Sequence, residues 1–138
     1  MVVKISHSLD SWLLYIHPPL AIIGYLLTFT LLFTLLRYRN DKGYKKIVSR
    51  VGITAWIFNL LGLVTGMIWA QMAWGRPFAF DPKETFTLLV FLSVGLNLYL
   101  FHGKKKMKWI LINGLISCIL IILTIIVPLL MSSIHGYA

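Results

Sequence analysis

Residues 109–131 read WILINGLISCILIILTIIVPLLM, a stretch without a charged side chain. A bilayer core about 30 Å thick is crossed by roughly 20 apolar residues in a helix. Three more charge-free stretches precede it, at 11–36, 51–75 and 85–103, and with the last 30 residues they hold 100 of the 138 residues. Such long runs, without polar and apolar alternation, indicate helices rather than barrel strands. We therefore expect an all-α membrane protein with four transmembrane helices in a bundle.

The composition excludes a water-soluble enzyme, because 59% of the residues are hydrophobic and only 12% are charged. The first apolar stretch is too long for a cleaved secretory signal, so we interpret it as a helix of the mature protein. The single cysteine, Cys118, is expected to be a small core residue, and no Cys-x-x-Cys-His motif could attach haem covalently. We expect no catalytic residues, because no nucleophile or acid–base pair stands out.

Two connections carry most of the positive charge. Ten of the 13 Lys and Arg residues lie at 37–50 and 104–108. The positive-inside rule places both connections in the cytoplasm, so both termini and the middle loop face outward. The net charge of +9 then serves topology and anionic lipid head groups, and no nucleic acid partner is expected.

We expect one domain, residues 1–138, whose composition within the spans indicates close helix packing. Inward-facing amides among the polar residues there are expected to hydrogen-bond neighbouring helices, with a substrate path as the alternative, and glycines permit close helix approach. The expected helices are at about 13–36, 51–72, 82–101 and 109–131, the polar residues are Thr54, Asn59, Gln71, Asn97 and Asn113, and the glycines are Gly52, Gly62, Gly66 and Gly95.

Topology separates the four histidines. His7 and His102 are expected to be solvated, the first in a polar amino-terminal segment and the second beside a basic cluster. His17 and His135 lie at the outer boundary of the membrane in the expected topology. They are either hydrogen-bonded interfacial residues or a pair of ligands on neighbouring helices, and both interpretations stay open at this point.

Prolines lie near both of these histidines. Pro18 and Pro19 suit the first turn of a helix, where a missing N–H breaks no bond, so His17 is expected at or just before the helix start. Pro128 is expected to bend the fourth helix about one turn before its outer end. It either tilts His135 toward the bundle axis or is an ordinary membrane-helix proline.

The middle loop runs into the third helix and reads WGRPFAFDPKET at residues 74–85. Asp81 suits the N-cap and Glu84 the third helical position, a capping box that any well-made helix could have. Three aromatic rings precede this cap on the water side, which is more than an interfacial aromatic belt explains.

Together these parts meet the needs of a haem site. Haem iron takes axial histidine, aromatic faces pack against a flat macrocycle, and cations and the positive end of a helix attract propionates. On the outer face the histidines are His17 and His135, the rings are Trp74, Phe78 and Phe80, and the cations are Arg76 and Lys83.

The 74–85 segment resembles the tryptophan-rich WGxxWxWDPKET segment of the cytochrome c assembly protein family, the haem-handling membrane proteins of the CcsA and CcmC type. The flanks are similar too. YIHPP at 15–19 resembles the context of the family's first external histidine, and IHGY at 134–137 resembles that of its second. Histidine, aromatic loop and histidine thus follow in the family's order over nearly the whole chain.

The resemblance implies haem b, iron protoporphyrin IX, with His17 and His135 as its axial ligands. The aromatic loop would hold the macrocycle on the extracytoplasmic side of the cell membrane for transfer, so the protein would be a haem carrier or a component of a haem lyase. The implied partners are haem, apocytochrome c or a haem carrier, other membrane subunits of the maturation system and lipid, with a homo-oligomer left open. In the loop the resemblance implies cofactor-binding roles for Trp74, Phe78, Phe80 and Asp81, and we expect Gly75, Arg76 and Lys83 to take part as well.

The chain departs from the family pattern at three points. Phe78 and Phe80 replace two tryptophans, which keeps the ring face and loses the indole N–H donor. No histidine lies deep in a span, so the second haem site of larger CcsA-like synthases is not expected. The chain is also shorter than those relatives, which suggests a minimal four-helix member that works with partner subunits.

Two other functions stay open on the sequence alone. A b-type electron-transfer subunit would hold haem permanently between His17 and His135, but one haem at one face cannot carry an electron across the membrane. A haem-free scaffold descended from haem handlers would show no Soret band even after haem is added.

Overall fold

The computed structural model describes residues 2–76 and 82–135, and the side chains at 15–72, 75–76 and 84–130. Most of these residues are helical, as the apolar stretches predict. The elements are α1 (Val2–Asn40), the short 3-10 helix η1 (Lys42–Tyr44), α2 (Lys45–Trp74), α3 (Pro82–His102) and α4 (Met107–His135). Each of the four α-helices contains a stretch long and apolar enough to cross a membrane, which confirms the expected fold class.

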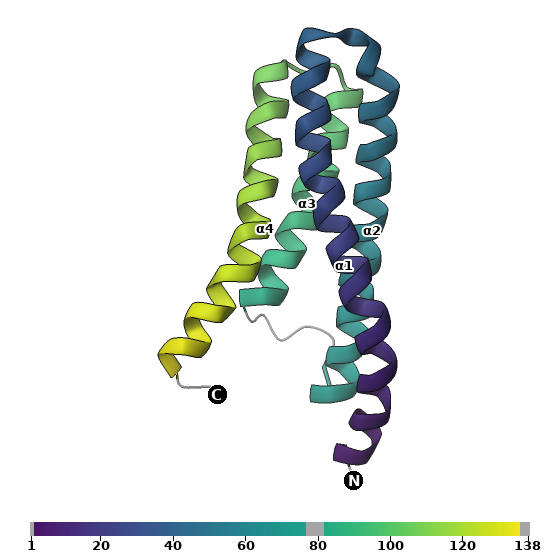
Figure 1. The fold of residues 1–138 in the computed structure, drawn as a ribbon, viewed down its shortest axis with the longest axis vertical. Coiled ribbons are helices and arrows are strands. Elements are labelled where there is room, and N and C mark those ends of the chain that lie inside the picture. The colour runs from purple at the N-terminus through teal and green to yellow at the C-terminus, as the bar shows by residue number, and fades with distance from the viewer. Residues whose placement is uncertain (1, 77–81, 136–138) are drawn as a thin grey trace.

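The two ends of the bundle carry different parts of the chain (Figure 1). One end, here called the basic end, holds the α1–α2 and α3–α4 connections with their Lys and Arg residues. The other, here called the terminal end, holds the start of α1, the end of α4 and the facing ends of α2 and α3. The even number of spans therefore brings the start of α1 and the end of α4 to the same end of the bundle.

The tight turn at the basic end is built by Asp41. Its side chain accepts a hydrogen bond of 2.9 Å from the Gly43 amide, as an N-cap does, while its own amide donates to the Arg37 carbonyl. The Lys42 ammonium lies 4.3 Å from the centroid of the Tyr38 ring. Such a contact keeps the charge at the interface while the stem covers apolar surface.

Helix α1 differs from its expected form. It begins at Val2 instead of near residue 13, so Pro18 and Pro19 lie inside the helix and His17 does not mark its start. Each proline removes one backbone hydrogen bond, which a membrane helix tolerates where neighbouring helices pack against it. Apolar letters at positions 2, 5, 9, 12, 13 and 16 have helical spacing, and this pattern extends the helix beyond the prolines.

Large side chains fill the bundle mainly toward the basic end. We call residues 26–61 and 93–119 the basic half, and residues 2–25, 62–76, 82–92 and 120–135 the terminal half. The buried apolar cluster consists of Leu31, Leu35, Val48, Ala55, Val94, Phe101 and Ile110 in the basic half, and Val90 and Ile121 in the terminal half.

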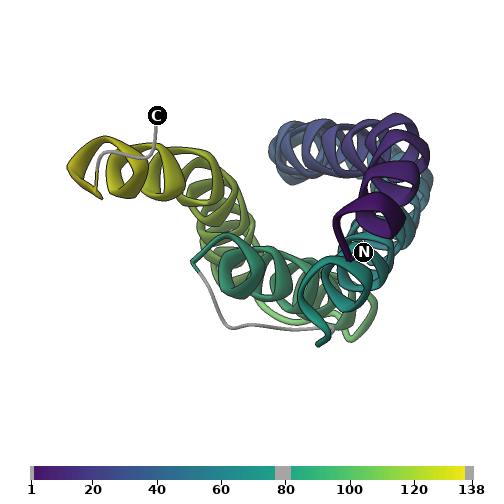
Figure 2. The ribbon, with the colours of Figure 1, turned by 90° about the horizontal axis from the view of Figure 1, so that it is seen from below.

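The terminal half is more open. Seen from that end, the helices follow one another along an arc (Figure 2). Near the basic end α1 and α4 are close, since a β-carbon built on Gly114 would lie 3.1 Å from Leu32 Cδ1. In both views the terminal end of α4 leans away from the start of α1.

Buried amides tie the helices in pairs. Asn59 of α2 donates from Nδ2 to the Gly24 carbonyl at 3.3 Å and to the Thr28 hydroxyl at 3.1 Å, both on α1. Asn113 of α4 donates to the Ser93 carbonyl of α3 at 2.8 Å. Asn97 also bonds across helices, through the Ile110 carbonyl. The expected role is thus confirmed for these three amides. Thr54 is exposed and bonds its own helix, and the fourth amide, Gln71, is also exposed.

Candidate functional site

His17 lies on α1 in the terminal half, and its ring faces α2. Its Nδ1 lies 3.0 Å from the hydroxyl oxygen of Thr65. A β-carbon built on Gly66 would lie 3.1 Å from His17 Cε1, so the ring edge packs against the bare backbone of α2. The histidine is half-buried, and two neighbouring residues of α2 therefore set the direction of its ring.

Close packing of α1 on α2 makes this contact possible. A β-carbon on Gly62 would lie 3.2 Å from Ala21 Cα, and a β-carbon on Gly24 would lie 3.0 Å from the backbone nitrogen of Asn59. Gly62 and Gly66 are four residues apart and share one face of α2, as in the small-xxx-small pattern of membrane helices. The expected close approach at these two glycines is confirmed.

Helix α3 also contacts α1 in this half. The Tyr25 and Thr87 hydroxyl oxygens lie 3.4 Å apart, a long hydrogen bond that joins the two helices. Nearer mid-membrane, the Trp56 and Phe91 rings stack with centroids 5.4 Å apart and planes 13° apart. These contacts connect the His17-bearing helix pair to α3.

The aromatic loop begins with a helix cap. Gly75 has φ 80°, a left-handed conformation that favours glycine, and its amide donates to the Gln71 carbonyl at 3.0 Å. Arg76 follows and is exposed. Trp74 ends α2 and Lys83 is the second residue of α3, but their side chains lie outside the described ones. Phe78, Phe80 and Asp81 lie outside the described residues.

His135 is the last residue of α4, at the same end of the bundle as the start of α1. Its side chain lies outside the described ones. The leaning of α4 separates this helix end from α1, so the two histidine-bearing helices share an end of the bundle but are not packed together there (Figures 1 and 2).

The remaining histidines differ in setting. His102 ends α3 at the basic end, where it is exposed, and its Nε2 lies 3.1 Å from the Ser49 hydroxyl oxygen. His102 is therefore exposed, as expected, but its ring also has a hydrogen-bond partner in the protein. His7 lies within α1, and its side chain is not described.

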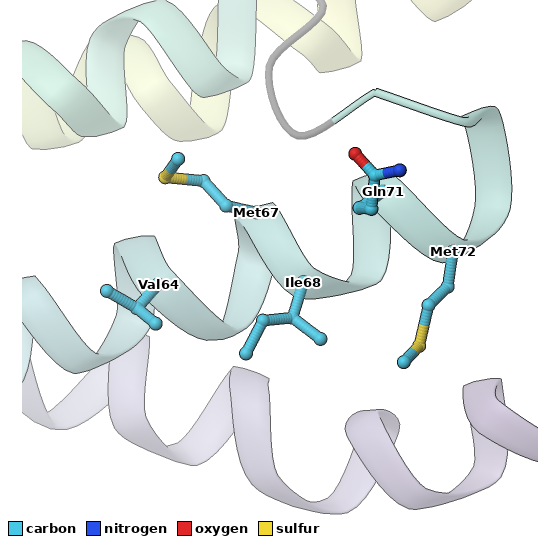
Figure 3. Close-up of a pocket in the computed structure, with 5 residues that line it drawn as sticks. All are labelled: Val64, Met67, Ile68, Gln71 and Met72. Carbon is cyan, nitrogen blue, oxygen red and sulfur yellow. The ribbon is translucent and has the colours of Figure 1, made fainter.

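A hollow of about 350 Å³ follows α2 along the turns that carry Thr65 and Gly66. It is apolar apart from one amide, and Figure 3 shows the side chains projecting from successive turns of the helix. Its described lining is Val64, Met67, Ile68, Gln71 and Met72. The terminal half therefore presents an apolar surface next to the His17-contacting face.

Among the described side chains, no three His, Cys, Asp or Glu residues gather as a metal site. Haem differs from a bare metal ion in this respect, because the porphyrin supplies the equatorial nitrogens and the protein supplies axial ligands. An imidazole held in one direction by a hydrogen bond to its other nitrogen is the usual form of a histidine ligand. His17 has a hydrogen-bond partner at Nδ1, the hydroxyl of Thr65.

The model of the family described as "Cytochrome C assembly protein" matches residues 3–135. The chain belongs to the cytochrome c assembly protein family. The match runs from the start of α1 to the end of α4, and it confirms the resemblance inferred from the 74–85 motif. No solved structure matches the chain.

Relatives in this family are larger proteins of cytochrome c biogenesis. The CcsA protein of Thermosynechococcus vestitus is 39% identical over 49 residues, which is 36% of this chain and 14% of the relative. The CcsA protein of Cyanidium caldarium is 35% identical over 73 residues, 51% of this chain and 25% of the relative. The CcmF protein of Escherichia coli is 35% identical over 86 residues, 57% of this chain and 13% of the relative. The chain thus spans a quarter or less of each.

Sequence reasoning missed Thr65. Nothing marks it as different from Thr54 until α1 and α2 are aligned. The available signal is the pair Gly62 and Gly66, because a small-residue face on α2 predicts the side that touches α1. Thr65 lies beside that face, where its hydroxyl is in contact with His17 of α1.

Proposed function

We propose that this member of the cytochrome c assembly protein family holds haem b at the terminal end of its bundle and presents it for c-type cytochrome maturation. His17 and His135 are the proposed axial ligands. The observation that carries the proposal is the His17 ring, oriented by Thr65 and Gly66 at the end of the bundle that also holds the start of α1, the end of α2, the start of α3 and the end of α4. Such outer-shell support is typical of ligand histidines.

The loop residues would bind the rest of the macrocycle. In the proposal, Trp74, Phe78 and Phe80 provide ring faces, and the cations Arg76 and Lys83 attract the propionates, with the positive end of α3 adding to that attraction. The glycine cap at Gly75 turns the chain from α2 into this loop, and Asp81 is the proposed cap of α3. Haem itself supplies the vinyl groups that react with the acceptor's thiols, so the protein's task is binding and orientation.

A pair of axial ligands requires α4 to approach α1. Pro128 lies inside α4 and removes the backbone bond that the fourth residue before it would accept, which weakens the helix about two turns before its end. We propose that α4 bends at Pro128. Bending at this proline would carry His135 toward the helix pair that holds His17.

The proposed orientation follows from charge. The basic end faces the cytoplasm by the positive-inside rule, so the terminal end is extracytoplasmic, with both termini outside. Apocytochrome c or a haem carrier would meet the protein there, beside other membrane subunits of the maturation system. A homo-oligomer is a further arrangement that purification can test.

A genetic experiment tests the function. Deletion of the gene should abolish covalent haem in c-type cytochromes and leave b-type cytochromes intact. Complementation with the wild type or with His102→Ala, whose histidine lies at the basic end, should restore the c-type cytochromes. His17→Ala and His135→Ala should not restore them. Normal c-type cytochromes in the deletion strain would overturn the proposal.

A further inference from the structure

Thr65 has two kinds of neighbour, and together they fix where its proton lies. Its hydroxyl oxygen is 2.8 Å from the Leu61 carbonyl oxygen and 3.1 Å from the Gly62 carbonyl oxygen, both in its own helix. Carbonyl oxygens only accept hydrogen bonds. A threonine in this position donates its single proton back to the helix, as threonines in membrane helices commonly do.

The same hydroxyl oxygen lies 3.0 Å from His17 Nδ1 on α1. Because the hydroxyl proton points toward the Leu61 and Gly62 carbonyl oxygens, the Thr65 oxygen directs a lone pair at His17 Nδ1. Two lone pairs facing each other at this distance would repel, so Nδ1 must carry a proton and donate it. In a neutral imidazole the other nitrogen, Nε2, then holds the lone pair.

Gly66 restricts the ring from a second side. Its missing side chain lets the His17 Cε1 edge lie where a β-carbon would be only 3.1 Å away. The ring is thus held by a hydrogen bond at Nδ1 and by the backbone of α2 along its edge. Thr65 determines the tautomer, and Gly66 limits the tilt.

We propose that Thr65 is a positioning residue that fixes His17 as the Nδ1–H tautomer and so commits Nε2 to iron. This inference rests on the proposed haem-binding function, but the tautomer itself is a property of the protein without haem. A neutral imidazole coordinates through its lone-pair nitrogen, so the hydrogen bond to Thr65 selects one nitrogen and one ring direction in advance.

The first test needs no cofactor. The ¹⁵N spectrum of histidine-labelled wild-type protein in detergent, at about pH 8 where imidazole is ordinarily neutral, distinguishes the protonated nitrogen from the unprotonated one. We expect His17 to show Nδ1–H and an unprotonated Nε2. A predominant Nε2–H tautomer would overturn the inference, whatever the protein binds.

Matched variants supply the second test. Thr65→Val keeps the shape of the side chain and removes the oxygen, whereas Thr65→Ser keeps the hydroxyl. Thr54→Val removes an exposed hydroxyl that bonds only the Arg50 carbonyl among its described contacts. We expect Thr65→Val to weaken haem b binding by about 10- to 100-fold, the usual cost of losing an outer-shell partner, and to lose the single tautomer. Thr65→Ser should restore both properties, and Thr54→Val should leave both unchanged.

The outcomes separate the two proposals. If His17→Ala binds haem like the wild type, the ligand assignment fails while the tautomer measurement still tests Thr65. If His17→Ala loses haem and Thr65→Val keeps wild-type affinity and tautomer, the positioning role fails and the function stands. The apo thermal unfolding midpoint shows whether Thr65→Val is folded, and the wild-type spectrum alone decides the tautomer if it is not.

Discussion

The two halves of the bundle are built differently. In the basic half, large side chains such as Leu35, Val48 and Phe101 fill the space between helices. In the terminal half the described contacts of α1 with α2 depend on glycines and on the ring of His17, and α4 leans away. The difference agrees with the proposed function, in which the basic half stabilises the fold and the terminal half holds the ligand.

The largest expected effect on stability lies in the basic half. Leu35 is fully buried, so Leu35→Ala should lower the free energy of unfolding by about 2 to 5 kcal/mol through lost contacts and a cavity. SDS titration of the protein in detergent measures the change. Leu36→Ala is the control, because Leu36 is 44% exposed, and its effect should be much smaller. Equal losses in the two variants would remove the basis of the comparison.

A medium effect is expected where α1 and α2 touch in the terminal half. Gly62→Ala would place a methyl group 3.2 Å from Ala21 Cα, a backbone atom that a side-chain rotation cannot move. Overpacking costs about 1 to 3 kcal/mol, and the better helix propensity of alanine returns up to about 1 kcal/mol. The same titration should show a net loss. An unchanged or higher stability would mean that the glycine is not needed for this approach.

The smallest effect on stability is expected for the hydrogen bonds between helices. Asn113→Ala removes the bond to the Ser93 carbonyl and the one that its Oδ1 accepts from the Ser93 hydroxyl. Membrane hydrogen bonds contribute about 0.6 kcal/mol each on average, so a loss near 1 kcal/mol is expected. Gln71→Ala, which removes an exposed amide, should change stability less. A larger loss of stability in Gln71→Ala than in Asn113→Ala would show that the α3–α4 pair does not depend on its buried amide.

Much of the fold follows from the sequence because charge is expensive in hydrocarbon. The gaps between charged residues locate the four spans, and the basic connections show which helix ends lie together. The start of α1 is different. Pro18 and Pro19 suit a helix start by local preference, whereas α1 runs through both prolines to Val2, and His17 just before them packs on α2 at Gly66.

Only part of the candidate site could be predicted from the sequence. The position of His17 near the end of its span depends on the chain alone, whereas its partner Thr65 depends on how α1 and α2 are aligned. That alignment is set by contacts of Gly62 and Gly66, which a one-dimensional pattern suggests but does not fix. The leaning of α4 likewise depends on packing, and no local signal predicts it.

The most direct test of the central claim is the visible and EPR spectrum of the purified protein with ferric haem b added. The account predicts low-spin haem with two axial histidines in the wild type and in His102→Ala. The double variant His17→Ala, His135→Ala should lose that spectrum and most of its bound haem. If the double variant binds the same amount of haem with the same low-spin spectrum, these two histidines are not the ligands and the account is contradicted.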